Sequence, residues 1–433
     1  MLRMGGLHRA RPRTHASAVL ALAALGLIAA GCGGGSPRST GPPTVTSGSG
    51  SEPAIPGVSY ASGQGAPYLS TKGAPRRLSG SGIGPLGGNL QTAATAAGTQ
   101  AGKAAGPKIT KPLGLKVGYI DIIGGIESAD RAHNSMRSAF LHLGAKWLYC
   151  DGAGNPQKWV SCGQSLLAQG VNVLAYTGID PSSIPAVIQE AKQKGVPVVD
   201  CCGQIGPGAS AQFAPDESLN GKVLAAYLKA KLATQPGAQD ILAIDYPAPW
   251  ATLRTDQLKI LAKQDADLKV VRSVTSDPTN LVAGTRKQVN DELTADPNLK
   301  AIWVAFDTAG QVAGQTVRSK FPGKQFPDKP LVVTFHADPS TQPLLASHAI
   351  DAVVDNNYDV TAWEVANAVA EHVARHTPFP PYTTSASYPG IGNPLAYQIV
   401  TAANLPPAGR YVAPKVDAVS YFVAKWKAEG FGR

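Results

Sequence analysis

Several motifs that mark catalysis are missing from this sequence of 433 residues. It contains no GxxxxGK[ST] loop for nucleotide phosphates and no GxSxG turn for a serine nucleophile. A GxGxxG match at residues 82–87 has no strand pattern before it and no helix pattern after it, so we attribute it to chance. These absences argue against an enzyme. An unrecognised pair of carboxylates is the one route to catalysis that they leave open.

The main part of the chain also lacks net charge. The formal charge at pH 7 is +10, but four arginines in residues 1–31 supply +4 of it and residues 32–111 supply the remaining +6. Nothing is left for residues 112–433, so the sequence predicts no basic surface for phosphates and no nucleic-acid partner.

The apolar run near the N-terminus, Ala18–Ala30, is too short for a good membrane-spanning helix. It follows the arginines and ends in small residues, which predicts an export signal over residues 1–31. The end of the run, Ala29-Ala30-Gly31-Cys32, resembles a bacterial lipobox, although Ala29 stands where the pattern prefers Leu. We therefore predict that Cys32 is lipidated and anchors the protein to the outer face of the cell membrane. The alternative is ordinary secretion, with Cys32 incidental.

Cysteine is scarce, with five residues in the chain. Outside the cytoplasm the four that follow Cys32 are expected to form disulfides, and four cysteines allow three pairings. We favour Cys150–Cys162, which closes a short loop from the end of a strand to the next helix. Cys201 and Cys202 then form a strained bond with each other or stay as buried thiols. Their spacing lacks the second pair that zinc sites use, so we predict no metal site.

Large apolar residues are nearly absent from residues 32–112, which consist mainly of Gly, Ser, Pro, Thr and Ala. Such a segment buries too little surface to offset the entropy lost on ordering. We predict a disordered tether.

After residue 112 the pattern changes to alternating strands and helices. The apolar run Leu115–Ile123 predicts a strand, Gly124-Gly125 a turn, and the following segment a helix with Met136 and Phe140 on its buried face. Ala145–Cys150 predicts the next strand. A strand, a helix and a second strand form a βαβ unit, which requires a parallel sheet. The same alternation continues to about residue 376.

Residues 151–200, DGAGNPQKWVSCGQSLLAQGVNVLAYTGIDPSSIPAVIQEAKQKGVPVVD, resemble the first domain of the ribose-type periplasmic binding proteins. The resemblance covers roughly residues 115–400. It implies an α/β fold of two lobes, each a doubly wound parallel sheet, joined by three crossovers near residues 213–216, 355–357 and 396–401. The lobes it implies are residues 113–214 plus 356–396, and residues 215–355 plus 397–433.

In this architecture the ligand lies between the lobes, beyond the carboxyl ends of the strands. The residues that we expect there are Asp121, Glu127, Ser128, Thr177, Trp250, Arg254, Phe306, Asp307, His336 and Asp355. Carboxylates, an arginine and an aromatic ring suit a sugar or polyol. Each carboxylate could instead cap a helix, and Arg254 could serve a structural ion pair. Cys202-Gly203 stands where the family commonly has Asp-Arg, which favours another polyol, a modified sugar or a small charged or heterocyclic molecule over an ordinary aldopyranose.

The resemblance implies a solute-binding protein of an ABC importer that is a monomer, has no enzyme activity or cofactor, and presents a small polar solute to permease subunits. One alternative is a receptor that reports its ligand to a membrane signalling protein. Another is the same fold with a nucleoside, amino acid or signalling molecule as ligand. The export signal and the lack of a helix-turn-helix exclude the repressors that share this fold.

Overall fold

The computed structural model describes residues 52–67, 82–203, 206–380, 382–383 and 385–431. The predicted export signal and Cys32 lie outside these ranges. No helix within them is long and apolar enough to cross a membrane.

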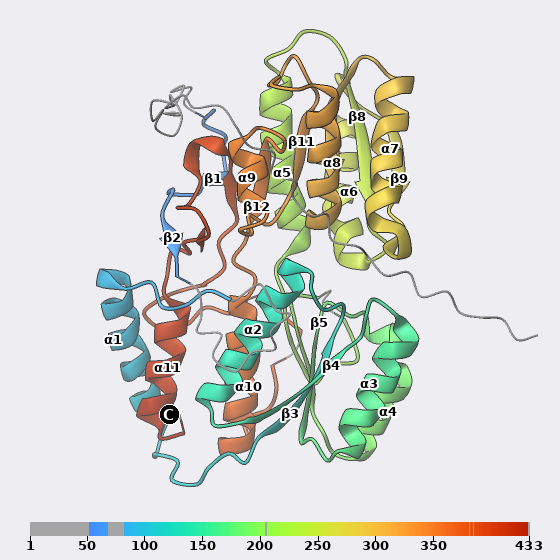
Figure 1. Cartoon of the computed structure of the whole chain (residues 1–433). Coiled ribbons are helices and arrows are strands. Elements are labelled where there is room, and N and C mark those ends of the chain that lie inside the picture. Colours follow the sequence, from blue (N-terminus) through green and yellow to red (C-terminus); the bar gives the residue numbers. More distant parts are fainter. Residues whose placement is uncertain (1–51, 68–81, 204–205, 381, 384, 432–433) are drawn as a thin grey trace, which may run out of the picture. The chain divides into compact units, whose positions relative to one another are not determined.

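Lobe 1 is built on a five-stranded parallel sheet with the order β4-β3-β5-β6-β7. Its strands are β3 (Lys116–Asp121), β4 (Lys146–Asp151), β5 (Val173–Thr177), β6 (Val198–Cys201) and β7 (Ala211–Phe213). One face of the sheet is covered by α2 (Glu127–His142) and α10 (Val360–Arg375), and the other by α3 (Pro156–Ala168) and α4 (Pro185–Gln193) (Figure 1). The central strands are apolar along their length because both faces are buried.

Lobe 2 contains a seven-stranded sheet with the order β1-β13-β12-β11-β10-β8-β9. Its strands are β1 (Ser59–Tyr60), β8 (Gln239–Asp245), β9 (Leu268–Thr275), β10 (Leu299–Val304), β11 (Leu331–Phe335), β12 (Ala352–Asp355) and β13 (Gln398–Val400). The helices are α5 (Glu217–Leu232) and α6 (Pro249–Gln264) on one face, and α7 (Leu281–Ala295), α8 (Asp307–Lys320) and the short α9 (Gln342–Ala346) on the other. Five neighbouring strands are parallel, whereas β13 runs antiparallel to β12 and carries β1 at the sheet edge.

The three predicted crossovers are present. The chain passes from β7 to α5, from β12 to α10, and from α10 to β13. It then returns to lobe 1, because the C-terminal helix α11 (Ala418–Glu429) packs Tyr421, Phe422 and Trp426 into the core that α2 and α10 share. Helix α11 therefore departs from the expected assignment of residues 397–433 to lobe 2, whereas β13 lies in the seven-stranded sheet.

The predicted disordered tether is wrong over much of its length. Residues 88–104 form helix α1 (Gly88–Ala104), which lies along α11 (Figure 1). Its buried positions are Ala94, Gly98 and Gly102, spaced four residues apart. A β-carbon on Gly98 would lie 2.1 Å from the carbonyl oxygen of Tyr421, so the two helix backbones touch where no larger residue fits. Small residues, which look like linker composition, here form a packing face.

Two more parts of the expected tether belong to the fold. The strand β1 joins the sheet of lobe 2, and β2 (Gly65–Ala66) pairs with β14 (Tyr411–Val412). The Ile83 N–H donates to Asp359 at 2.8 Å. Helix α1 follows the GxGxxG match, contrary to expectation, and the residues directly before the match lie outside the described residues. Residues 32–51 and 68–81 of the expected tether lie outside the described residues.

Candidate ligand-binding site

A cavity of about 80 Å³ lies between the lobes at the carboxyl ends of their strands. Its volume is several times the roughly 10–15 Å³ that one buried water needs, so the cavity suits a small solute. Side chains and backbone of both lobes line it: Ile122, Ile123, Ile126, Ser128, Ala129, Thr177, Gly178, Cys202, Pro215, Glu217, Tyr246, Trp250, Arg254, Phe306, His336 and Tyr358. We call this space the interlobe cavity.

Three aromatic rings of lobe 2 form one wall of the interlobe cavity. Tyr246 follows β8, Trp250 lies in the first turn of α6, and Phe306 directly precedes α8. The ring centroids of Tyr246 and Trp250 are 5.4 Å apart, and that of Phe306 lies 4.8 Å from Tyr246 and 5.7 Å from Trp250. Such a cluster offers an apolar surface to the C–H face of a ligand. Tyr246 was not predicted, although its place directly after a strand is the signal that identified the others.

Arg254 lies one helical turn after Trp250, and its guanidinium carbon is 5.0 Å from the Trp250 ring. The guanidinium is 3% exposed and forms a two-point ion pair with Glu217, with nitrogen–oxygen distances of 2.5 and 2.8 Å. It also donates to the Ala305 carbonyl at 3.0 Å. Because most of its donors are already used, Arg254 is chiefly a buried ion-pair partner that also lines the cavity.

His336 follows β11 in a left-handed backbone conformation, with φ of 63°. Its Nε2 accepts a hydrogen bond from Arg254 at 3.4 Å, and its Nδ1 has no hydrogen-bond partner among the residues that the structure describes. Burial, together with the positive charge of Arg254, lowers the pKa of His336 well below its ordinary value. The ring is therefore neutral at pH 7, with the proton on Nδ1 because Nε2 accepts from Arg254.

Lobe 1 contributes an apolar wall with a few polar atoms. Ile122, Ile123 and Ile126 come from the loop between β3 and α2, a set that the sequence did not single out. The hydroxyl of Thr177, at the end of β5, accepts a hydrogen bond from Tyr119 at 2.7 Å. Six of the ten predicted ligand-binding residues line the interlobe cavity: Ser128, Thr177, Trp250, Arg254, Phe306 and His336. That they bind a ligand stays a prediction.

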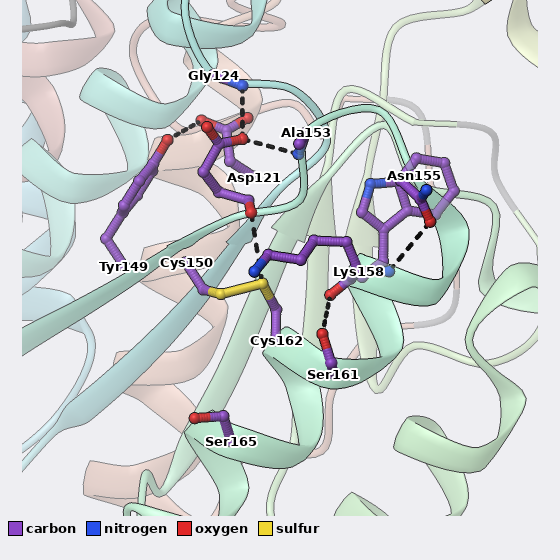
Figure 2. The surroundings of a disulfide bond; sticks show 12 residues. Asp121, Gly124, Tyr149, Cys150, Ala153, Asn155, Lys158, Ser161, Cys162 and Ser165 are labelled. Atoms are coloured by element: carbon purple, nitrogen blue, oxygen red, sulfur yellow. Dashed lines mark hydrogen bonds between the residues drawn. A yellow bond between two sulfur atoms is a disulfide. The ribbon is translucent and has the colours of Figure 1, made fainter. Parts of the chain in front are cut away.

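The four predicted carboxylates do not line this cavity. Asp121 accepts a hydrogen bond from Tyr149 at 2.9 Å (Figure 2), and burial raises its pKa to about 6. Glu127 accepts the Ser340 N–H at 3.0 Å. Asp307 is buried, which raises its pKa to about 6, while a hydrogen bond from Ser128 acts in the opposite direction. These three carboxylates are engaged by other groups of the protein, but none of the contacts named here is the helix cap that the sequence left open as an alternative.

The fourth carboxylate, Asp355, belongs to a buried ionic cluster with Arg131, Asp338 and Asp359. We call these four residues the Arg131 cluster. The Arg131 guanidinium, from α2 of lobe 1, lies 3.0 Å from Asp338, 3.1 Å from Asp355 and 3.1 Å from Asp359. Asp338 follows β11 and Asp355 ends β12, both in lobe 2, so the cluster joins the two lobes. Although burial alone raises the pKa of Asp355, the Arg131 charge lowers it below its ordinary value.

Tyr358 connects this cluster to the interlobe cavity. Its ring lines the cavity, lies 4.6 Å from the Arg131 guanidinium carbon and meets the His336 ring edge-on at 4.6 Å. Its hydroxyl donates to the Ser128 carbonyl at 2.8 Å. Sequence analysis missed both Tyr358 and Arg131.

The disulfide Cys150–Cys162 is present, as predicted, and joins the end of β4 to α3 (Figure 2). Cys201 and Cys202 are free thiols. No group of three or more His, Cys, Asp or Glu side chains in the part of the chain that the structure describes is arranged to hold a metal ion.

Two α/β lobes that enclose a small cavity at the carboxyl ends of their strands define a bilobed binding protein. The family model described as "Periplasmic binding protein domain" matches residues 124–376, more than half of the sequence, and the chain belongs to this family. It is a family of extracytoplasmic binding proteins. No curated protein matches the chain.

Solved structures share the fold. An ABC transporter solute-binding protein from Mycobacterium smegmatis with bound glycerol is 18% identical, covering 69% of this chain and 99% of its own at a TM-score of 0.58. The 5-methylthioribose transporter solute-binding protein from Thermotoga lettingae, in complex with 5-methylthioribose, is 15% identical and covers 72% and 99% at 0.59. A solute-binding protein from Agrobacterium vitis with bound allitol is 17% identical and covers 67% and 97% at 0.57.

Proposed function

We propose that this protein is the solute-binding component of an ABC importer, anchored outside the cell membrane through lipidated Cys32, and that it acts as a monomer without catalysing a reaction. Its ligand is a small sugar, polyol or derivative held in the interlobe cavity. The observation that carries the proposal is this cavity, which combines an aromatic wall from lobe 2 with hydroxyl groups from lobe 1. The relatives with bound glycerol, allitol and 5-methylthioribose support the ligand class.

Each part of the cavity has a physical task in binding. The rings of Tyr246, Trp250 and Phe306 cover the C–H face of the ligand, and the hydroxyls of Ser128 and Thr177 face its polar groups. The ion pair between Arg254 and Glu217 holds α6 against α5, which keeps the aromatic wall in place. Binding removes the ligand from water between the lobes and involves no covalent step.

A thermal-shift screen of residues 33–433 tests the proposal. The protein must include residues 52–111, because β1 and α1 are parts of the fold. The panel contains glycerol, allitol, 5-methylthioribose and pentoses, with nucleosides and amino acids as the competing classes. A saturable rise in melting temperature for a sugar or polyol is expected, because a ligand that binds only the folded state stabilises it. A rise confined to nucleosides or amino acids would contradict the ligand class.

A pair of variants on helix α6 then locates the site. Trp250→Ala removes a ring from the cavity wall and is expected to weaken binding of the screened ligand at least about tenfold, which corresponds to 1.4 kcal/mol. Leu253→Ala, an exposed position on the same helix, is the matched control and is expected to leave the affinity unchanged. Equal affinities of the two variants in titration calorimetry would place the ligand elsewhere.

A further inference from the structure

Two adjacent thiols lie at the wall of the interlobe cavity. Cys201 ends β6 and is fully buried, whereas Cys202 lines the cavity. Their sulfur atoms are 3.0 Å apart, about 1 Å more than the roughly 2.05 Å of a covalent S–S bond. The two sulfur atoms are therefore in contact, and a bond between them requires an approach of about 1 Å.

The backbone around the pair holds this arrangement. Cys202 has a φ of 65°, in the left-handed region that a residue with a β-carbon rarely occupies. Its N–H donates to the Phe213 carbonyl at 3.1 Å, which ties the turn to β7. A β-carbon on Gly203 would lie 2.6 Å from a carboxylate oxygen of Asp200, so the turn is tightly packed on that side as well. The surroundings therefore hold Cys202 in a backbone conformation that is unfavourable for a cysteine, with its sulfur against that of Cys201. This arrangement indicates that the two thiols act as a pair.

Joining the sulfurs leaves no neighbouring polar group without a partner. The Cys202 thiol lies 3.4 Å from the Tyr358 carbonyl and 3.2 Å from the Thr361 hydroxyl, but this hydroxyl already donates to the same carbonyl at 2.7 Å. The Thr177 hydroxyl, 3.4 Å from the Cys201 sulfur, accepts from Tyr119. Each acceptor that would lose an S–H donor therefore keeps another hydrogen-bond donor.

We propose that Cys201 and Cys202 form a vicinal disulfide in the exported protein, and that its S–S bond is part of the ligand-facing wall of the interlobe cavity. The oxidant is a disulfide of the extracytoplasmic space, of the chemical class that also serves Cys150–Cys162. Two cysteine thiols and one external disulfide give the Cys201–Cys202 bond and two external thiols, through a mixed disulfide whose leaving group takes up the proton. The wall then presents an apolar S–S edge to the ligand in place of thiol donors.

Burial also constrains when the bond forms. It raises the pKa of the Cys202 thiol well above its ordinary value, so the folded dithiol holds little of the reactive thiolate. The exchange therefore takes place as the chain folds outside the cytoplasm, while both thiols are exposed. Adjacent α-carbons are about 3.8 Å apart, closer than the 4.4–6.8 Å of most disulfides, so the bond is strained and more easily reduced than Cys150–Cys162.

Peptide mass spectrometry of the full-length exported protein tests the inference. The cells are lysed in N-ethylmaleimide, which blocks free thiols and prevents later air oxidation, and the protein is unfolded in the same reagent and digested with trypsin. Residues 195–222 form one tryptic peptide whose only cysteines are Cys201 and Cys202. We expect this peptide to lack two hydrogen atoms and to carry no label, and to take up two labels only after reduction.

The Cys150–Cys162 bond is the internal control, because its survival in the same digest shows that the sample was not reduced during handling. Two labels on peptide 195–222 beside an intact Cys150–Cys162 bond would overturn the inference, as would a small thiol attached to either cysteine. The result does not depend on which ligand binds, so it stays separate from failure of the ligand screen. In a titration with a phosphine reductant, we expect Cys201–Cys202 to open at a lower concentration than Cys150–Cys162, and the opposite order would contradict the strain.

Discussion

Arg254 and Arg131 are both buried arginines with carboxylate partners, but the partners lie in different places. Arg254 pairs with Glu217 inside lobe 2, one cation with one anion. Arg131 extends from lobe 1 to Asp338 and Asp355 of lobe 2 and to Asp359 at the start of α10, one cation with three carboxyl groups. The first arrangement shapes a wall of the interlobe cavity, whereas the second holds the two lobes against each other. Substitution of Arg254 should therefore act directly on the cavity wall, whereas substitution of Arg131 should act on the cohesion of the lobes.

Arg131→Met is expected to have the largest effect. It leaves the carboxylates of the Arg131 cluster buried without their cation, and removal of one partner from a buried ionic group costs about 3–5 kcal/mol. We expect a loss at the upper end of this range in urea unfolding. A loss below about 1 kcal/mol would show that the cluster is open to water in solution.

The two carboxylates of lobe 2 provide the controls for that substitution. Burial raises the pKa of Asp338 well above its ordinary value, so Asp338→Asn removes a group that is readily protonated and is expected to cost little. Asp355→Asn removes a carboxylate whose pKa Arg131 lowers and is expected to cost more. The reverse order in urea unfolding would contradict this distribution of charge.

Arg254→Met is expected to have the next largest effect. It should lower the free energy of unfolding by about 3 kcal/mol and abolish ligand binding. The double variant Glu217→Gln/Arg254→Met removes both charges, so much of the stability should return while binding stays lost. Urea unfolding and titration calorimetry on the single and double variants form the measurement. Ligand binding by the double variant at the original affinity would show that the ion pair does not shape the cavity.

Gly98→Val tests the packing of α1 against α11, a contact that does not line the interlobe cavity. The added side chain meets the Tyr421 backbone and displaces α1 from α11, near the segment whose Ile83 N–H bonds Asp359. Overpacking of this kind costs about 1–3 kcal/mol. The exposed Ala96→Val on the same helix is the control. We expect unchanged ligand affinity for both variants, and weaker binding by Gly98→Val would show that α1 influences the cavity.

Two buried carboxylates, Asp307 and Asp355, should make stability depend on pH with opposite signs. Burial raises the pKa of Asp307 from 3.8 to about 6, so the folded state holds this proton more tightly and stability falls as pH rises from about 4 to about 6. The lowered pKa of Asp355 gives stability that is present above its ordinary pKa and is lost as pH falls below it. In urea unfolding from pH 3 to 7, Asp307→Asn should make the slope between pH 4 and 6 less negative by on the order of 1 kcal/mol per pH unit. An unchanged slope would mean that Asp307 is already charged at pH 4.

The sequence predicted the parallel part of both sheets because buried β-branched runs and amphipathic helices alternate there. It failed where the signal is composition rather than periodicity. The Ala- and Gly-rich α1 has no large apolar residue on its buried face, since Gly98 and Gly102 leave room for backbone atoms of α11. Short strands such as β1 and β13 contain two and three residues, too few to show any alternation.

For the candidate site, the rule that ligands lie at strand ends found Trp250, Arg254, Phe306 and His336. It could not show which polar side chains face the cavity and which face each other. Arg131 and Asp338 are 207 residues apart, so no local pattern indicates that they pair. Tyr358 lies two residues before α10 and contacts residues of both lobes, and no local pattern in the sequence indicates these contacts either.

The position of Tyr358 has a consequence for how the two arginine sites act together. The Tyr358 ring borders the interlobe cavity and also contacts the Arg131 guanidinium. A ligand that packs on this ring and the Arg131 cluster therefore both act on one equilibrium, the closing of the two lobes. In a protein whose lobes separate to admit a solute, the apparent affinity is the intrinsic affinity multiplied by the fraction of molecules in the closed, binding-competent form. A change in the Arg131 cluster then alters the apparent dissociation constant without touching the solute. By the same linkage, the solute changes the free energy of separating the lobes by an equal amount.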